Sequence, residues 1–273
     1  MNAQIINSAN CMSPRWITGV IATGLVLMTD GKFVRNDEIW SLDNFTFKNP
    51  TFEDVVDTWG GASRRIARPG LETNNETGIV RQSLLVYTPL PLFLAQPVLS
   101  AAVSETNEIY QSSGIPIILA PVTLIRKRNL PFSSSSSYDT LLALTQMPRR
   151  GHDLVVGLFA DLNTCGRAFQ DCQHPECAFA IVDISCLGAY TLPHELGHIQ
   201  GANHNREATW PNTVTRFNNA YGTVVARFWR TIMAYSLQNE RRLPFFSNGT
   251  RPHENNAWVI SQTRLTISKY GRR

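Results

Sequence analysis

Three of the six histidines of the chain lie within the segment HELGHIQGANH at 194–204. His194 and His198 are four positions apart, so on a helix both imidazoles leave the same face, one turn apart. Two such nitrogens can bind one Zn²⁺ at about 2.0–2.1 Å. Gly201 allows a positive-φ turn out of the helix, after which His204 returns toward the first two histidines. The spacing therefore predicts a zinc ion held by all three.

Three protein ligands are typical of a catalytic zinc, because they leave a coordination position for water. Glu195 lies beside the first ligand and can accept a proton from that water without binding the metal. Chance gives HExxH in on the order of 1% of chains of this size, and the full pattern with its glycine and third histidine in on the order of one in 10⁵. We therefore predict metal-assisted hydrolysis with Glu195 as the general base.

A second segment, TIMAY at 231–235, follows downstream. Alone it is an ordinary apolar stretch, but after HExxHxxGxxH it looks like the Met-turn of the metzincin signature, with Met233 beneath the zinc ligands. The chain resembles that clan. Within the clan it is similar to the secreted peptidyl-Asp metalloendopeptidases of bacteria and fungi over roughly residues 80–270. The segments that carry this likeness are LLVYTP at 84–89, DLVVGLF at 153–159, CGRAF at 165–169, YTLPHELGHIQGANH at 190–204, RTIMAY at 230–235 and NNAWVISQTR at 255–264.

The resemblance implies a metzincin-like α/β (α+β) fold, with a twisted mixed β-sheet, an active-site helix and a C-terminal helix. It also implies that Tyr235 approaches the zinc, where its hydroxyl would bind the oxyanion of the reaction or the resting metal. A tyrosine packed in the core is the alternative. The chain departs from the pattern at Asn205, where many metzincins have Asp. Because that residue is not a ligand, we expect altered hydrogen bonding near the third histidine and an active enzyme.

The resembled family is named for cleavage on the N-terminal side of aspartate. An acidic side chain there needs a cation in the pocket that receives it, and a guanidinium gives a bidentate grip. The resemblance places the wall of that pocket around and after the Met-turn, where the sequence has Arg227, Arg230, Arg241 and Arg242. Taken singly, each arginine is better explained as a solvated surface charge. Taken together, the four arginines make a basic pocket as plausible as four solvated surface charges.

The elements that position these motifs are strands alternating with helices. Apolar runs bounded by turn residues predict strands, and apolar residues at helical spacing predict helices. This alternation indicates an α/β sandwich with a mixed sheet. We expect the last strand, 178–184, to be an edge strand that binds an extended peptide, which favours endopeptidase action. The predicted strands are 84–87, 115–125, 153–160 and 178–184, and the predicted helices are 95–110 and 138–146, the second with a serine N-cap.

The N-terminal part of the chain differs from the rest. Residues 17–29, ITGVIATGLVLMT, are too short to span a bilayer, which takes about 20 apolar residues. They resemble the apolar region of a secretory signal peptide, with a buried strand or helix as the alternative. We predict a signal peptide at 1–30, a short propeptide or N-terminal subdomain at 31–77, and a zinc metalloprotease catalytic domain at 78–273.

Four of the five cysteines fall in one short stretch: Cys165, Cys172, Cys177 and Cys186. Their spacing lacks the paired CxxC pattern of zinc sites, which favours disulfides over metal binding. Among the three possible connectivities we predict Cys165 with Cys186, and Cys172 with Cys177. Together with the signal-like segment, the cysteines predict a secreted, extracellular protein.

The composition limits the class of protein. Hydrophobic residues make up 43% of the chain and charged residues 17%, which argues against a mostly disordered chain. The net charge is +4, but no nucleic-acid-binding motif accompanies the dispersed basic residues. We expect protein or peptide substrates, no nucleic-acid partner, no stable membrane insertion and a monomer. A catalytically weak, zinc-containing binding or toxin module on the same fold is the alternative function, against which the intact Glu195 argues.

Overall fold

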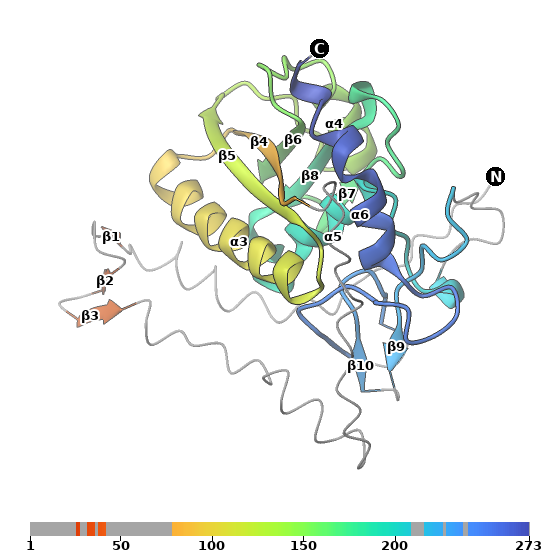
Figure 1. Cartoon of the computed structure of the whole chain (residues 1–273). Helices are drawn as coiled ribbons and strands as arrows, with labels where there is room; N and C mark the ends of the chain where they lie inside the picture. The colour runs from red at the N-terminus through yellow and green to blue at the C-terminus, as the bar shows by residue number, and fades with distance from the viewer. Residues whose placement is uncertain are drawn as a thin grey trace. The chain divides into compact units, whose positions relative to one another are not determined.

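The computed structural model describes residues 78–208, 216–225, 228–236 and 240–272, together with three short strands nearer the N-terminus. These strands are β1 (Val26–Leu27), β2 (Lys32–Arg35) and β3 (Glu38–Ser41), which pair antiparallel in a sheet of their own. The predicted signal peptide and the predicted propeptide or subdomain otherwise lie outside the described residues and stay predictions. The regular elements from residue 80 onward carry the candidate site (Figure 1).

Five strands form one sheet in the order β5-β4-β6-β8-β7. Four of them correspond to the predicted strands and run parallel to one another, and the fifth, β7, is antiparallel to its neighbour. The continuous apolar sequences of β6 and β8 are typical of parallel strands that are buried on both faces. The predicted mixed α/β sheet is therefore confirmed. These four strands are β4 (Val80–Thr88), β5 (Ile117–Arg126), β6 (Leu154–Phe159) and β8 (Phe179–Asp183).

Four helices accompany this sheet: α3 (Leu92–Ser112), α4 (Ser137–Leu144), α5 (Thr191–Ile199) and α6 (Asn256–Ile267). All four were expected, since α5 contains the HExxH segment and α6 is the predicted C-terminal helix. The predicted serine cap of α4 is Ser136, whose Oγ accepts a hydrogen bond from the backbone N–H of Asp139 at 3.1 Å. Among the helices of the described segments, none has both the length and the apolar character needed to cross a membrane.

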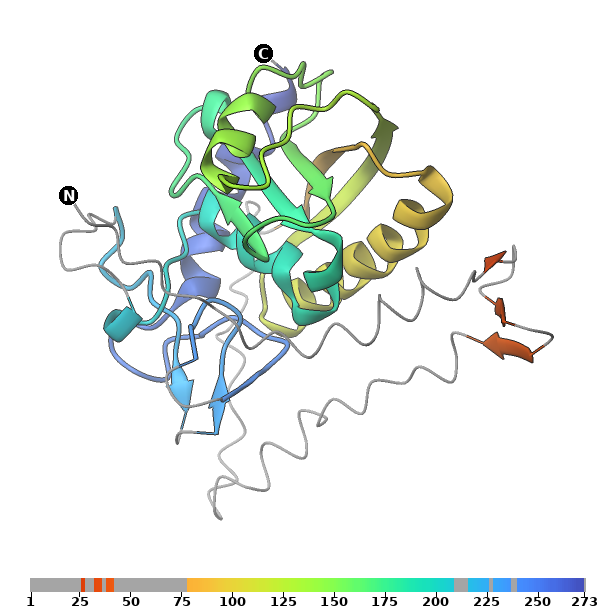
Figure 2. The ribbon, with the colours of Figure 1, turned by 180° about the vertical axis from the view of Figure 1, so that it is seen from behind.

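Alternate residues of the central strands divide the core into two layers. Leu84 and Val86 of β4 belong to a cluster that includes residues of α3, α5 and α6. Leu85 and Tyr87 belong to a second cluster, which includes residues of α4. Because successive strand side chains point to opposite faces, each face of the sheet is covered by helix (Figures 1 and 2).

A smaller sheet follows α5 along the chain. Its strands are β9 (Val224–Val225), β10 (Trp229–Arg230) and β11 (Arg241–Arg242), in the order β11-β10-β9. Strand β10 pairs antiparallel with β9 and parallel with β11. In both views β9 and β10 lie on one side of α5 and the five-stranded sheet lies on the other (Figures 1 and 2). The HExxH helix is therefore placed between two sheets.

The prediction that strand 178–184 is the edge of the large sheet is wrong. A further strand, β7 (Gly166–Ala168), pairs antiparallel with β8 and occupies the outer position. Three residues are too few to show the alternating pattern of a strand, so sequence periodicity could not predict β7.

The backbone of β7 has one side that bonds to β8 and one side that pairs with no strand of the described residues. The carbonyl oxygen of Cys165 accepts a hydrogen bond from β8 at 2.8 Å, and the N–H of Phe169 donates to β8 at 3.4 Å. Residues that bond to the neighbouring strand alternate along an antiparallel pair. The intervening groups of Gly166 and Ala168 therefore point away from β8, toward the outer edge of the sheet, where the carbonyl oxygen of Gly166 accepts a hydrogen bond from Oγ1 of Thr164 at 3.2 Å.

The disulfide Cys165–Cys186 joins the start of β7 to the segment before α5, as predicted. Cys172 and Cys177 are free thiols, so the prediction that they form a second disulfide is wrong. Each thiol is directed at a backbone carbonyl instead. Sγ of Cys172 lies 2.6 Å from the carbonyl oxygen of Cys177, and Sγ of Cys177 lies 3.2 Å from that of His174.

Replacing both Cys165 and Cys186 with serine should lower the free energy of unfolding by about 3 kcal/mol, because the bridge closes a loop with a sequence separation of 21 residues. Urea unfolding under non-reducing conditions measures this change. The control is Cys177→Ser, which alters a half-buried free thiol and should change stability by less than about 1 kcal/mol. Equal stabilities for the double variant and the wild type would contradict the prediction.

Candidate metal centre and active site

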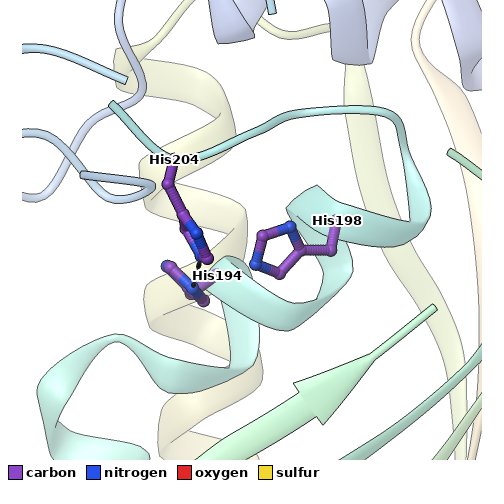
Figure 3. A group of neighbouring side chains, drawn as sticks. All are labelled: His194, His198 and His204. Atoms are coloured by element: carbon purple, nitrogen blue, oxygen red, sulfur yellow. Dashed lines mark hydrogen bonds between the residues drawn. The ribbon is translucent and has the colours of Figure 1, made fainter. Parts of the chain in front are cut away.

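The three predicted histidines come together at one point. His194 and His198 lie one turn apart on α5, and His204 belongs to the loop that follows (Figure 3). The Nε2 atoms of His194 and His204 are 3.3 Å apart, and the candidate ligand atoms of all three lie within 4.8 Å of one another. Two nitrogens bound to one tetrahedral zinc at about 2.0–2.1 Å would be about 3.3 Å apart. The cluster therefore fits a zinc ion.

Backbone carbonyls orient two of the imidazoles. Nδ1 of His194 lies 2.9 Å from the carbonyl oxygen of Ile232, and Nδ1 of His198 lies 3.1 Å from that of Ala202. An Nδ1–H that donates to a carbonyl leaves Nε2 with its lone pair for a metal. Gly201, with a φ of 93°, makes the predicted left-handed turn that ends the helix and brings the third histidine back.

Burial keeps the three imidazoles neutral. It lowers the pKa of His198 to about 4. Burial is also the main reason that the pKa values of His194 and His204 lie well below the ordinary value, and the charge of Arg242 acts in the same direction. Because only a neutral imidazole can bind a metal, the cluster is ready for zinc at neutral pH.

The Met-turn packs against the back of the HExxH helix. Met233 is fully buried, and a Cβ added to Gly197 of α5 would lie only 2.6 Å from its Sδ. The glycine in HELGH therefore allows the sulfur to approach the helix. The neighbouring Ile232 supplies the carbonyl that orients His194, so the turn contacts both the helix backbone and a candidate ligand.

Glu195 follows the ligand His194 on α5 and is only 5% exposed. Its carboxylate packs against β7, since a Cβ added to Gly166 would be 2.6 Å from Oε1. Burial raises the pKa of Glu195 to about 8, and the positive charges of Arg242 and Arg167 oppose this shift. A carboxyl group in this range can both accept a proton and release it.

Tyr235 lies beside the histidines, with its ring centroid 3.7 Å from that of His204. The backbone N–H of Tyr235 donates to Oδ1 of Asn205 at 2.9 Å, and Nδ2 of Asn205 donates to Oε2 of Glu207 at 3.0 Å. The asparagine thus uses its amide to hold the Met-turn next to the third histidine. Tyr235 is 42% exposed; its partial burial, together with the negative charge of Glu195, raises its pKa to about 12, so the phenol keeps its proton and can donate a hydrogen bond.

Comparison with known proteins agrees with this geometry. The sequence model of metallo-peptidase family M12 (Reprolysin_5) matches residues 93–247, more than half of the chain. The chain belongs to metallo-peptidase family M12. The predicted zinc metallopeptidase is therefore confirmed, and the three-histidine cluster is the zinc site of this M12 peptidase.

The curated relatives of this M12 peptidase include bacterial enzymes named peptidyl-Asp metalloendopeptidase. The enzyme of Xanthomonas campestris pv. campestris is 30% identical over 200 residues, which cover 64% of this chain and 47% of the relative. The enzyme of Pseudomonas fragi is 27% identical over 172 residues, covering 61% of this chain and 99% of the relative. The chain spans about half the length of the Xanthomonas enzyme.

A solved structure of a chaperone–substrate complex resembles the M12 peptidase in fold. It superposes with a TM-score of 0.53 at 18% sequence identity, over 70% of this chain and 36% of that chain. At this level of identity the likeness concerns the arrangement of the elements alone, and the chemistry of the site rests on its own residues.

Of the four arginines predicted around the Met-turn, Arg242 has the strongest link to the metal centre. Its Nη1 donates to the carbonyl oxygen of Ala189, before α5, at 2.7 Å. Arg230 donates to two backbone carbonyls of its own loop, at 3.1 and 2.6 Å. Arg241 is exposed, and Arg227 lies outside the described residues.

Sequence reasoning missed two residues of β7 that border the site. Gly166 abuts the Glu195 carboxylate, and the charge of Arg167 acts on the same carboxylate. Both belong to the CGRAF segment, which supported the resemblance to the peptidyl-Asp family but has no sequence pattern that by itself indicates a strand or a functional site. The pairing of β7 with β8 and the Cys165–Cys186 disulfide bring this segment to α5.

Proposed function

We propose that this M12 peptidase is a secreted zinc-dependent endopeptidase that cleaves on the N-terminal side of aspartate. The observation that supports it most is the convergence of three imidazole nitrogens within 4.8 Å of one another, with a buried carboxylate on the same helix. We assign His194, His198 and His204 as the zinc ligands, Glu195 as the general base and Tyr235 as a donor to the reacting oxygen.

Each residue then has one task in peptide hydrolysis. Zinc, when bound, supplies a Lewis acid that lowers the pKa of water and polarises the scissile carbonyl. Glu195 takes a proton from the attacking water and passes it to the leaving amine. The protonated phenol of Tyr235 donates a hydrogen bond to the carbonyl oxygen as negative charge develops there. Carbonyls of Ile232 and Ala202 keep the imidazoles of α5 in the tautomer that faces the metal.

The outer edge of β7 supports endopeptidase action. The backbone groups of Gly166 and Ala168 point away from β8, and an extended peptide can add to such an edge through main-chain hydrogen bonds. Gly166 also touches the general base, so a peptide paired with β7 passes directly over the reacting groups. A chain held along an edge strand extends on both sides of the scissile bond, as cleavage of internal bonds requires.

Two further observations support the finer parts of the proposal. The relatives at 30% and 27% identity carry the name peptidyl-Asp metalloendopeptidase, and the positive charge of Arg242 acts on Glu195. An acidic substrate side chain beside a carboxylate needs such a cation nearby. The Cys165–Cys186 disulfide supports secretion, because disulfides persist in oxidising compartments.

A peptide library digested by the metal-loaded enzyme tests the proposal. We expect cuts within the peptides, with Asp enriched at the position after the cut, and loss of all cleavage when 1,10-phenanthroline removes the metal. Metal analysis should give about one zinc per chain. Cleavage that is insensitive to the chelator would contradict the zinc mechanism, whereas chelator-sensitive cuts before bulky apolar residues would contradict only the Asp preference.

A further inference from the structure

The proposed cleavage before aspartate raises the question of which residue receives the carboxylate. The cation must lie close to the reacting groups. It must also be fixed in place, because the side chain of the substrate aspartate is short. Glu195 already brings one carboxylate to this region. A second carboxylate, from the substrate, would be repelled there unless a fixed cation offsets it.

Arg242 meets both conditions. It is half-buried on β11, and its Nη1 is anchored on the carbonyl of Ala189 at 2.7 Å. This bond joins the strand after the Met-turn to the segment that leads into α5. Ala189 lies two residues before the start of α5 and five before His194, the first ligand. The guanidinium is therefore held beside the beginning of the helix that carries the metal ligands and Glu195.

The other cations of the site are less suited. Arg230 is committed to two carbonyls of its own loop. Arg167 follows Gly166 on β7, and successive side chains of a strand point to opposite faces. Since Gly166 faces Glu195, the side chain of Arg167 leaves the other face, where its Nε donates to Oγ of Ser137 at 2.9 Å.

We infer that Arg242 is the specificity-determining residue of this peptidase: its guanidinium, held by Ala189 between the start of α5 and β11, binds the carboxylate of the aspartate that follows the scissile bond. The inference rests on the proposed function. A peptide extended along β7 sends alternate side chains to the face of the large sheet that α5 covers. The small sheet lies on the other side of α5 (Figures 1 and 2). Arg242 lies on that small sheet, and a planar guanidinium pairs with a carboxylate in bidentate fashion.

The test uses two peptides that differ only in Asp or Asn after the scissile bond, because these side chains have nearly the same shape. In the wild type we expect kcat/KM to be roughly 30-fold or more higher for the Asp peptide, as for a charge pair shielded from solvent. In Arg242→Gln this ratio should fall below about 3. Arg242→Lys keeps the positive charge but lacks the bidentate geometry of the guanidinium, so it should give an intermediate ratio. This variant remains informative if Arg242→Gln does not fold.

Two matched variants serve as controls. Arg241→Gln removes the adjacent exposed charge, and Arg167→Gln removes the cation on β7; both should keep the wild-type ratio of Asp to Asn cleavage. A merely structural role of Arg242 would lower both rates and leave their ratio unchanged. That result, or a collapse of the ratio in Arg167→Gln instead, overturns the inference. A wild type that cleaves neither peptide, or cleaves both equally, overturns the proposed function first and the inference with it.

Discussion

Replacing Glu195 with glutamine should lower kcat for a peptide substrate by about 10²–10⁴-fold, the usual contribution of a general base. Glutamine has the same shape and fits the space against Gly166, but it cannot take the proton of the attacking water. Because burial disfavours the charged carboxylate of Glu195, a neutral amide should not destabilise the fold. We expect the zinc content and the unfolding temperature to equal those of the wild type.

His198→Ala is the matched control on the same helix. It removes a ligand and leaves the general base in place, so its zinc content should fall sharply. The two variants therefore separate loss of the base from loss of the metal. Turnover by Glu195→Gln within about threefold of the wild type would rule out the assigned mechanism. A full complement of zinc in His198→Ala would rule out the assigned ligands.

The part of the site that the sequence predicted depends on short-range geometry. His194 and His198 share one helical turn, so the helix alone brings their imidazoles together. Gly201 and His204 lie within one short loop, and the left-handed turn at the glycine returns the chain to the helix. The buried strands were predictable for a similar reason, because burial on both faces leaves a continuous apolar run.

The parts that sequence reasoning missed depend on contacts between distant segments. Arg242 and Ala189 are 53 positions apart, and nothing in either segment distinguishes Arg242 from its neighbour Arg241. Strand β7 exists because β8 offers it a partner, and the contact of Gly166 with Glu195 follows from that pairing. Local sequence patterns do not contain information on such contacts, because the sequence of a segment shows the same pattern whether or not its partner lies next to it in the fold.

The cysteines show the same limit. Cys165 and Cys186 flank the β7–β8 pair and are brought together by it. Cys172 and Cys177 lie close in sequence, which favoured pairing, but both thiols are directed at backbone carbonyls of their loop. Counting cysteines restricts the possible pairs, and the local path of the chain decides which of them form.

Gly166→Ala should lower kcat by about 10²-fold while zinc content and stability stay near those of the wild type, since displacement of a reacting group by about 1 Å can have that effect. A Cβ at this position would lie 2.6 Å from Oε1 and 2.7 Å from Cγ of Glu195. The carboxylate has to move because β7 is fixed by its pairing with β8. Gly78→Ala is the control, because a Cβ there meets no atom within 4 Å.

A double-mutant cycle decides whether Gly166 acts through the general base. If it does, Gly166→Ala should cause almost no further loss of kcat in a Glu195→Gln background, because the group that it displaces no longer takes part in the reaction. If Gly166 instead serves only to bind the peptide along β7, its substitution should raise KM by the same factor in both backgrounds. Independent losses of kcat in the two backgrounds would show that the contact between β7 and Glu195 has no role in placing the base.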